Sequence, residues 1–222
     1  MNINKTIKGT LAVASLTLTT MGASFAGNLA PGVTIVPPLS TETGVLLTQQ
    51  TNTFTNPLNT YSGSLYSAVY QEAGGTLDFI FQVQNNKASV DNLSRIEGGI
   101  YSGYDVSAFY STQAGGLGVG SQVPNSAFET NSTGVGFNFM SGLGSANLAP
   151  GTTSDVLIVR TNAKSYINSL EGVSDNTTVN VASYSPAAAV PEPASVIPFA
   201  LGGLGLLGLI VRKTRRTSGA AA

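Results

Sequence analysis

The 222-residue sequence predicts an all-β fold: a single antiparallel β-sandwich, jelly-roll-like, between two apolar terminal segments. Three observations support this prediction. Apolar and polar residues alternate with a period of two in several stretches, clusters of Gly, Asn, Ser and Pro separate these stretches, and no long helical pattern lies between the ends. Seven or eight short strands of this kind are typical of a sandwich or jelly roll.

The strands are recognised by alternation and by their β-branched and aromatic residues. Alternation is clearest at residues 65–70, 77–84 and 135–139, and further strands are expected near residues 44–54, 100–110, 155–162 and 177–184. A short helical turn is expected at residues 162–170. Residues 115–131 lack alternation, so we expect a long loop there.

The composition excludes several classes of chemistry. The chain has no Cys, no His and no Trp, and only 9% of its residues are charged, far below the roughly 25% of ordinary soluble domains. Without imidazole or thiolate groups there is no Ser-His-Asp triad, no thiol nucleophile and no zinc site of the usual kinds. We therefore expect a protein that is not an enzyme and that has no cofactor and no metal.

The N-terminus has the pattern of a secretory signal peptide. Lys5 and Lys8 precede the apolar residues 11–25, and small residues occupy the two positions that a signal peptidase reads. We predict a signal peptide over residues 1–26, cleaved by signal peptidase between Ala26 and Gly27. The alternative is an amphipathic helix, but Ser and Thr are the only polar residues in the apolar stretch.

The C-terminus predicts one transmembrane helix. Residues 195–211 carry no charge and span about 25 Å as a helix, slightly short of a ~30 Å hydrocarbon core. A basic tail at residues 212–216 follows and is expected to stay on the cytoplasmic side. The cations of this tail are Arg212, Lys213, Arg215 and Arg216. They argue against the alternative, a buried hairpin or core helix.

Charge divides the chain into three zones. Residues 1–26 carry a net +2, residues 27–190 a net −6 and the last 32 residues a net +3. Basic ends around an acidic body are the pattern of export followed by membrane retention. The acidic body also predicts that the protein does not bind nucleic acid.

The residues before the apolar helix resemble a known sorting signal. Pro191-Glu192-Pro193, the Gly/Leu-rich helix and the basic tail, together residues 191–216, look like the PEP-CTERM sorting signal of exported bacterial proteins. The resemblance implies recognition by an exosortase, a membrane-embedded enzyme, with processing at or near Pro-Glu-Pro. It also implies a precursor anchored in the inner membrane of a Gram-negative bacterium, followed by delivery to the cell surface or extracellular matrix.

The body between the signals has the size of one domain. We place a β-sandwich ectodomain at residues 27–184 and a linker at residues 185–190 that holds it off the membrane. Residues 75–83 and 156–163 resemble a recurrent ectodomain of PEP-CTERM proteins. This resemblance implies co-occurrence with the sorting signal, and it brings no catalytic residues.

The remaining polar chemistry in the body leaves alternatives open. Asp78, Glu97 and Asp105 lie in or beside expected strands, where they are either solvated surface carboxylates or a glycosidase pair. Asp78 alternates with Phe79 and Phe81, so its side chain is expected to point away from the core.

Two turn sequences and three tyrosines complete the candidates. The pairs Asp91-Asn92 and Asp175-Asn176 suit either calcium or ordinary turns. Tyr101, Tyr104 and Tyr110 suit either a carbohydrate platform or core packing.

The expected function is that of an exported structural or adhesive protein of the surface, matrix or biofilm. The alternative is a lectin-like module that binds an exopolysaccharide, and an enzyme is the third reading.

Overall fold

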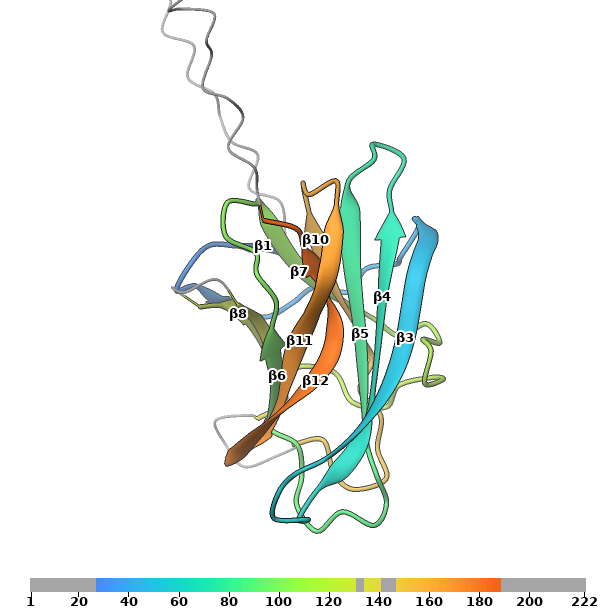
Figure 1. Ribbon diagram of the computed structural model, residues 1–222, viewed down its shortest axis with the longest axis vertical. Coiled ribbons are helices and arrows are strands. Elements are labelled where there is room, and N and C mark those ends of the chain that lie inside the picture. The colour runs from blue at the N-terminus through green and yellow to red at the C-terminus, as the bar shows by residue number, and fades with distance from the viewer. Residues whose placement is uncertain (1–26, 131–133, 141–146, 189–222) are drawn as a thin grey trace, which may run out of the picture.

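The computed structural model describes residues 27–130, 134–140 and 147–188 (Figure 1). These residues form twelve strands and no helix, and every pairing between the strands is antiparallel. The strands make two six-stranded sheets that pack face to face. The prediction of an all-β fold with a two-sheet sandwich is confirmed.

The first sheet, sheet A, contains the longest strand of the described chain. Its order is β1 (Asn28–Leu29), β7 (Val106–Ser111), β10 (Val156–Thr161), β5 (Leu77–Asn85), β4 (Ser62–Gln71) and β3 (Val45–Thr55). The second sheet is sheet B. Its order is β12 (Thr177–Pro186), β11 (Tyr166–Asp175), β6 (Arg95–Gly98), β9 (Val135–Asn138), β8 (Ser126–Glu129) and β2 (Thr34–Ile35).

The main core lies between the sheets and follows the strand register. In sheet A, Phe79 pairs with Val69 on one side and with Val159 on the other, and all three side chains are buried. In sheet B, Ile96 pairs with both Val173 and Phe137, which are also buried. Because alternate residues of a strand share a face, these rows oppose each other across the sandwich. Full burial of each such side chain stabilises the fold by about 1.5–3 kcal/mol.

A second apolar cluster covers part of the outer face of sheet A. Tyr66, Ile80, Val156 and Ile158 are buried there, and Leu117 packs against them. Leu117 belongs to the segment between β7 and β8, which therefore shields the sheet from outside. This cover explains how residues that point away from the main core are nevertheless buried.

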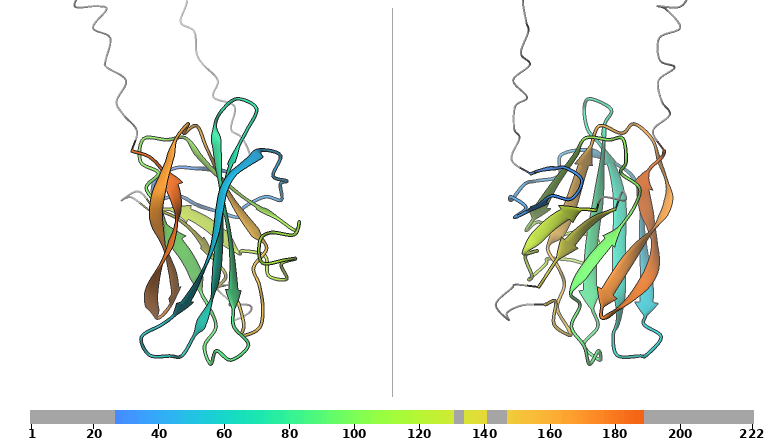
Figure 2. Two further views of the ribbon diagram at one scale, coloured as in Figure 1. Left: turned by 45° about the vertical axis from the view of Figure 1, so that its right-hand side comes forward. Right: turned by 90° about the vertical axis from the view of Figure 1, so that its left-hand side faces the viewer.

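The two sides of the sandwich are built differently (Figure 2). On one side the N-terminal segment supplies β1 to sheet A and β2 to sheet B. On the other side β3 and β12, the long edge strands of the two sheets, lie side by side. The Thr48 hydroxyl is 3.0 Å from the Tyr184 hydroxyl there, and the Asn52 amide donates to the Ala182 carbonyl at 3.1 Å.

The expected helical turn at residues 162–170 is wrong. Residues from Tyr166 onward belong to β11, which pairs along ten residues with β12. Asn176, with a φ of 51°, makes the tight turn between these two strands, and Asn tolerates this left-handed conformation. The exposed first half of β11 lacks clear alternation, so the long-range pairing, not the local pattern, decides its conformation.

Other boundaries also differ from the prediction. Only β7 forms within the strand expected at 100–110, and the loop expected at 115–131 contains β8. β12 continues to Pro186, two residues into the expected linker.

The predicted signal peptide, transmembrane helix and sorting motif fall outside the described residues, except for Gly27 and the start of the linker. Within the described ranges, no apolar helix of membrane-spanning length is present.

Candidate functional site

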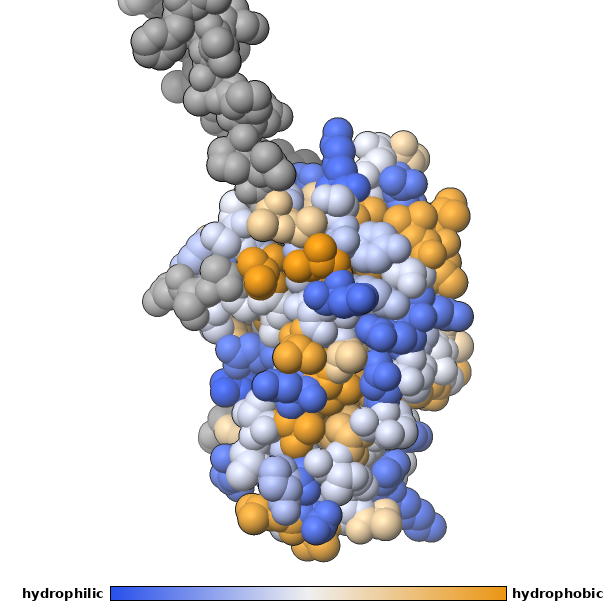
Figure 3. Space-filling model, in the orientation of Figure 1, coloured by the Kyte–Doolittle hydropathy of each residue, from blue (hydrophilic) through white to orange (hydrophobic). Residues whose placement is uncertain are grey.

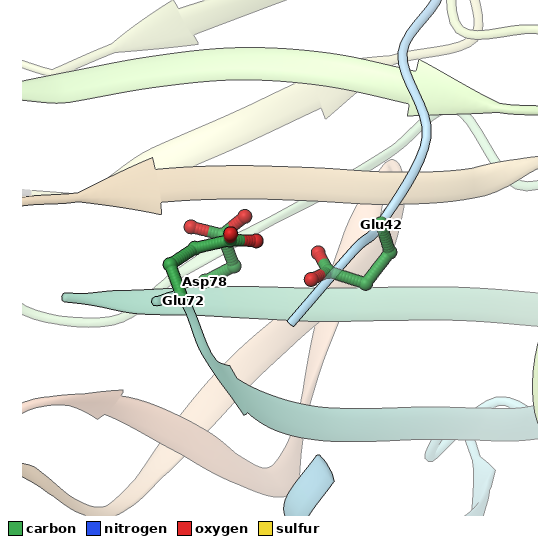
Figure 4. Close-up of side chains that lie close together, drawn as sticks. All are labelled: Glu42, Glu72 and Asp78. Carbon is green, nitrogen blue, oxygen red and sulfur yellow. The ribbon is translucent and has the colours of Figure 1, made fainter. Parts of the chain in front are cut away.

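Three carboxylates meet on the outer face of sheet A (Figure 4). Glu42 lies just before β3, Glu72 lies just after β4, and Asp78 lies in β5. One oxygen from each group lies within 4.8 Å of the others. We call this group the carboxylate cluster, and it is the densest gathering of acid groups in the part of the chain that the structure describes.

Asp78 is placed by the pleat of β5. Its side chain is on the face opposite Phe79, as the alternation predicted, but the residue is only 1% exposed. Arg160 stands directly opposite on β10, and its Nε donates to Asp78 Oδ2 at 2.9 Å. Arg160 also lies over the ring of Phe109, 4.7 Å from its centroid, in a cation–π contact.

Arg160 fixes the segment that carries Glu42. Its NH2 group donates to the Thr41 carbonyl at 2.7 Å. Glu42 Oε1 accepts hydrogen bonds from the backbone N–H groups of the next two residues, Thr43 at 3.1 Å and Gly44 at 2.8 Å. The other oxygen, Oε2, is buried and has no hydrogen-bond partner within the described residues.

Glu72 is held by the turn between β4 and β5. Its N–H donates to the Thr76 carbonyl, and its carbonyl accepts from Gly75, whose φ of 78° suits glycine. The Thr43 hydroxyl lies 3.2 and 3.3 Å from the two Glu72 carboxylate oxygens and donates to them. Three chain segments are therefore tied together by Arg160 and Thr43.

Two acids of the cluster, Glu42 and Asp78, bind a proton more tightly than free carboxyl groups do. Burial and the negative charge of Glu42 raise the pKa of Asp78 to about 7, although Arg160 opposes the shift. Burial also raises the pKa of Glu42, the hydrogen bond from Gly44 N–H lowers it, and the negative charge of Glu72 raises it further. Asp78 and Glu42 therefore titrate at higher pH than ordinary carboxyl groups, and Asp78 is only partly ionised at neutral pH.

Beside the cluster is a shallow polar depression of about 390 Å³. Its rim consists of hydroxyl side chains, and Glu72, Asp78 and Arg160 form part of its lining. The hydroxyl residues are Ser40, Thr41, Thr43, Thr76 and Thr161. Carboxylate oxygens are ligands that hard cations accept, but Arg160 already supplies a positive charge to Asp78.

The other acids named from the sequence do not join the cluster. Glu97 is 3.4 Å from Arg95 in an exposed ion pair, and Asp105 accepts from the Asn162 amide at 2.8 Å. Glu42 and Glu72 were not predicted as site residues, because they belong to segments whose proximity depends on strand pairing.

The three candidate tyrosines do not form a platform. Tyr101 is 1% exposed and packs edge-on against Phe79, with ring centroids 5.8 Å apart. Tyr104 packs against the main core, and its hydroxyl donates to the Ala187 carbonyl at 2.7 Å. Tyr110 is half-buried and belongs to β7. The packing interpretation holds for Tyr101 and Tyr104.

The candidate calcium turns serve the fold. The Asp91 carbonyl accepts from the buried Asn85 amide at 3.0 Å, and Asp175-Asn176 forms the turn between β11 and β12.

Of the predicted processing residues, Gly27 is the one that the structure describes. Its carbonyl accepts from Ala108 N–H at 2.8 Å, so the predicted mature N-terminus is fixed to β7. The remaining processing residues lie outside the described chain: Ala26, Pro191, Glu192, Pro193, Arg212, Lys213, Arg215 and Arg216.

Comparison with known families identifies the C-terminal segment. A family model described as the PEP-CTERM protein-sorting motif matches residues 189–216. The chain carries the PEP-CTERM sorting motif. The motif indicates an exosortase-sorted surface protein, whose precursor is exported and membrane-anchored. The match covers the sorting signal and not the sandwich. No curated protein and no solved structure matches the chain.

Proposed function

We propose that this PEP-CTERM protein is a structural or adhesive component of the cell surface, extracellular matrix or biofilm of a Gram-negative bacterium, and that it is not an enzyme. The sorting motif at residues 189–216 is the observation that carries the proposal. The sandwich supports it because buried Asp78 joins β5 to β10 through Arg160, and the Tyr104 hydroxyl bonds to the Ala187 carbonyl just after β12.

The proposal includes two processing steps. Signal peptidase removes residues 1–26, and an exosortase then acts at or near Pro191-Glu192-Pro193 while residues 195–211 span the membrane with the basic tail inside. Measuring the intact mass and terminal peptides of protein from membranes and from culture medium tests both steps. We expect a mature form that begins at Gly27 and ends near residues 191–193.

A triple variant tests the role of the motif. Changing Pro191→Ala, Glu192→Gln and Pro193→Ala should leave the protein in the membrane with its tail intact. The matched control is Pro31→Ala, a change at an exposed proline of the sandwich. If the triple variant is processed like the control, exosortase recognition of this motif is contradicted.

The matrix role has its own experiment. Deleting the coding sequence should reduce the biofilm mass, and restoring the full chain should recover it. Restoring the sandwich with the signal peptide but without residues 191–216 should not, because unsorted protein leaves the surface. If all three strains form equal biofilms, the structural role fails while the sorting result stands.

A lectin-like module for an exopolysaccharide is the second candidate. A depression of about 340 Å³ on the outer face of sheet A is lined by Gln49, Tyr66, Tyr70 and Gln113, a mixture of aromatic and amide groups that sugars use. Binding of the purified host exopolysaccharide that Tyr70→Ala abolishes and that Tyr104→Phe leaves unchanged would favour it.

A further inference from the structure

The outer edge of β3 is the long unpaired strand edge of sheet A. β3 pairs with β4 along one side, from Val45 to Thr55. Within the described residues, no backbone or side-chain group bonds to the β3 main chain from the other side. Extended backbone with free N–H and C=O groups is a template for another β-strand.

The sequence of β3 carries none of the usual protection against such pairing. No charged residue and no proline occurs in its eleven residues, and the chain has no charge at all between Glu42 and Glu72. Edge strands that must stay single are normally shortened, charged, broken by proline or covered. The irregular register between Leu46 and Thr48 affects only the start of the strand.

The opposite side of the same sandwich shows that protection. There the N-terminal segment covers β7: Pro38 accepts from Tyr110 N–H at 3.1 Å, and Ser40 N–H donates to Tyr110 at 2.8 Å. This segment contains three prolines and supplies the two-residue edge strands β1 and β2. One side is therefore closed by the chain itself, whereas the β3 edge is left open.

The first residues of β3 add exposed apolar surface. Val45, Leu46 and Leu47 are 71%, 41% and 44% exposed. Figure 3 shows apolar surface at the upper right, over the end of the sandwich where β3 begins. A partner strand along β3 would cover part of this surface as well as satisfy the backbone.

We propose that β3 pairs antiparallel with β3 of a second copy of this chain, so that the two copies of sheet A join into one continuous sheet. Antiparallel pairing about a two-fold axis brings the same strand to both sides of the interface. Because β3 carries no charge, two copies of it can pair without like-charge repulsion. The strand also has no charged side chain that would select a partner of opposite charge.

The structure also favours β3 over β12 as the strand that a second copy presents. β12 is the other long edge, but the Asn52 amide of β3 already donates to its Ala182 carbonyl. Tyr184 of β12 likewise contacts Thr48. The edge of β12 is thus partly closed by side chains from β3, whose own edge stays accessible.

Cysteine cross-linking of the full chain tests the pairing directly. The chain has no cysteine, so single Cys variants at each position from Gln49 to Thr53 report one contact each. Directly opposite residues have Cβ atoms about 4.5–5.5 Å apart, close to the separation that a disulfide needs. Under mild oxidation we expect disulfide dimers to peak several-fold at the position on the two-fold axis.

The control is Asn168→Cys, an exposed position on β11 of sheet B, which pairs with Tyr184 of β12. Equally weak cross-linking at all five β3 positions and at residue 168 would overturn the proposal. A mixture of a β3 Cys variant and a β12 Cys variant tests the alternative pairing. A disulfide between β3 of one copy and β12 of another would overturn the proposal in favour of open-ended assembly.

A charge variant provides the second measurement. Thr51→Lys on the exposed face of β3 should shift the full chain in detergent from dimer to monomer mass, whereas Asn168→Lys should not. The two variants share the same C-terminal segment, so association through it cannot explain a difference. Circular dichroism shows whether each variant remains folded. If Thr51→Lys does not fold, the Cys scan alone tests the β3 pairing. Sorting and retention are measured separately, so a monomer would leave the proposed function standing.

Discussion

Arg160 and Asp78 form an ion pair across neighbouring strands, with Nε 2.9 Å from Oδ2 and the Asp78 side chain 2% exposed. The same guanidinium reaches the Thr41 carbonyl and lies over the Phe109 ring. One side chain thus connects β10 and β5 to the segment that enters β3. The pair therefore has a structural role on the outer face of sheet A, where it holds these three segments together.

Removing Arg160 should destabilise the sandwich. Arg160→Ala leaves Asp78 buried without its cation and frees residues 41–43. Breaking a buried pair costs about 3–5 kcal/mol, and the 31% exposure of Arg160 reduces our expectation to about 2 kcal/mol. Urea unfolding of the sandwich measures the change.

The exposed pair Arg95–Glu97 supplies the control for this substitution. Its side chains are 46% and 29% exposed, so Arg95→Ala should cost less than about 0.5 kcal/mol. Equal losses for the two arginine variants would show that Arg160 is no more than a surface charge.

The sandwich should be more stable in mild acid than at neutral pH. The pKa of Asp78 rises from 3.8 to about 7, and that of Glu42 also rises. The folded protein therefore keeps protons that the unfolded chain has released, and the free energy of unfolding falls as pH rises from about 4 to 7. Melting temperatures at about pH 5 and pH 7.5 measure this slope.

Asp78→Asn should reduce that slope, because an amide does not titrate. Asp105→Asn removes an exposed carboxylate instead and should keep it. A slope that survives Asp78→Asn unchanged would place its origin elsewhere in the protein.

How far the sequence could predict this site is clear from Asp78. Alternation with Phe79 correctly placed its side chain on the face away from the core. The same pattern could not show that this face is covered, since the cover comes from residues 41–43 and from Arg160, 82 residues away. Local periodicity indicates which face of the sheet a side chain points to, whereas its burial depends on which other segments pack on that face.

The strands were predictable to the extent that their own side chains alternate between core and solvent. β4, β5 and β10 carry large apolar residues and were identified from the sequence. β11 was not, because its first half is exposed on both faces and its conformation depends on pairing with β12. The sorting signal was easier still to recognise, since it is a linear motif.

Glu171 should make the core sensitive to alkaline pH. It lies on the same face of β11 as the core residue Val173 and is 2% exposed, and its Oε2 has no partner among the described residues. Burial and the nearby charge of Glu97 raise its pKa well above 4.5. Above about pH 4.5 the Glu171 carboxyl is ionised in the unfolded chain and protonated in the folded protein. Folding therefore takes up a proton, which costs about 1.4 kcal/mol per pH unit.

Glu171→Gln should remove this cost. The amide has the shape of the protonated acid, so the variant and the wild type should melt within a few degrees of each other at about pH 5. At about pH 8 the variant should melt at the higher temperature. A constant difference at all pH values would mean that Glu171 does not change its protonation on folding.

Gln82 should be the residue that holds the cover over the outer cluster of sheet A. Its buried amide donates to the carbonyls of Gly118 at 2.9 Å and Ser154 at 3.1 Å, and its Oε1 accepts from Leu117 N–H at 2.8 Å. Gln82→Leu keeps a similar volume but removes all three bonds, and it leaves the Leu117 N–H and the Ser154 carbonyl without these partners. Because unpaired buried groups cost about 1–3 kcal/mol, we expect a loss of about 2 kcal/mol.

Hydrogen exchange separates this effect from a general loss of packing. In Gln82→Leu the Leu117 amide should exchange much faster, while amides of β11 and β12 should change only as global stability falls. Gln84→Leu is the matched control, because its amide makes one 3.3 Å bond, to the Thr153 hydroxyl, on the same strand. If Leu117 exchange is the same in both variants, residues 115–118 are held by the apolar contact of Leu117 and not by the Gln82 amide.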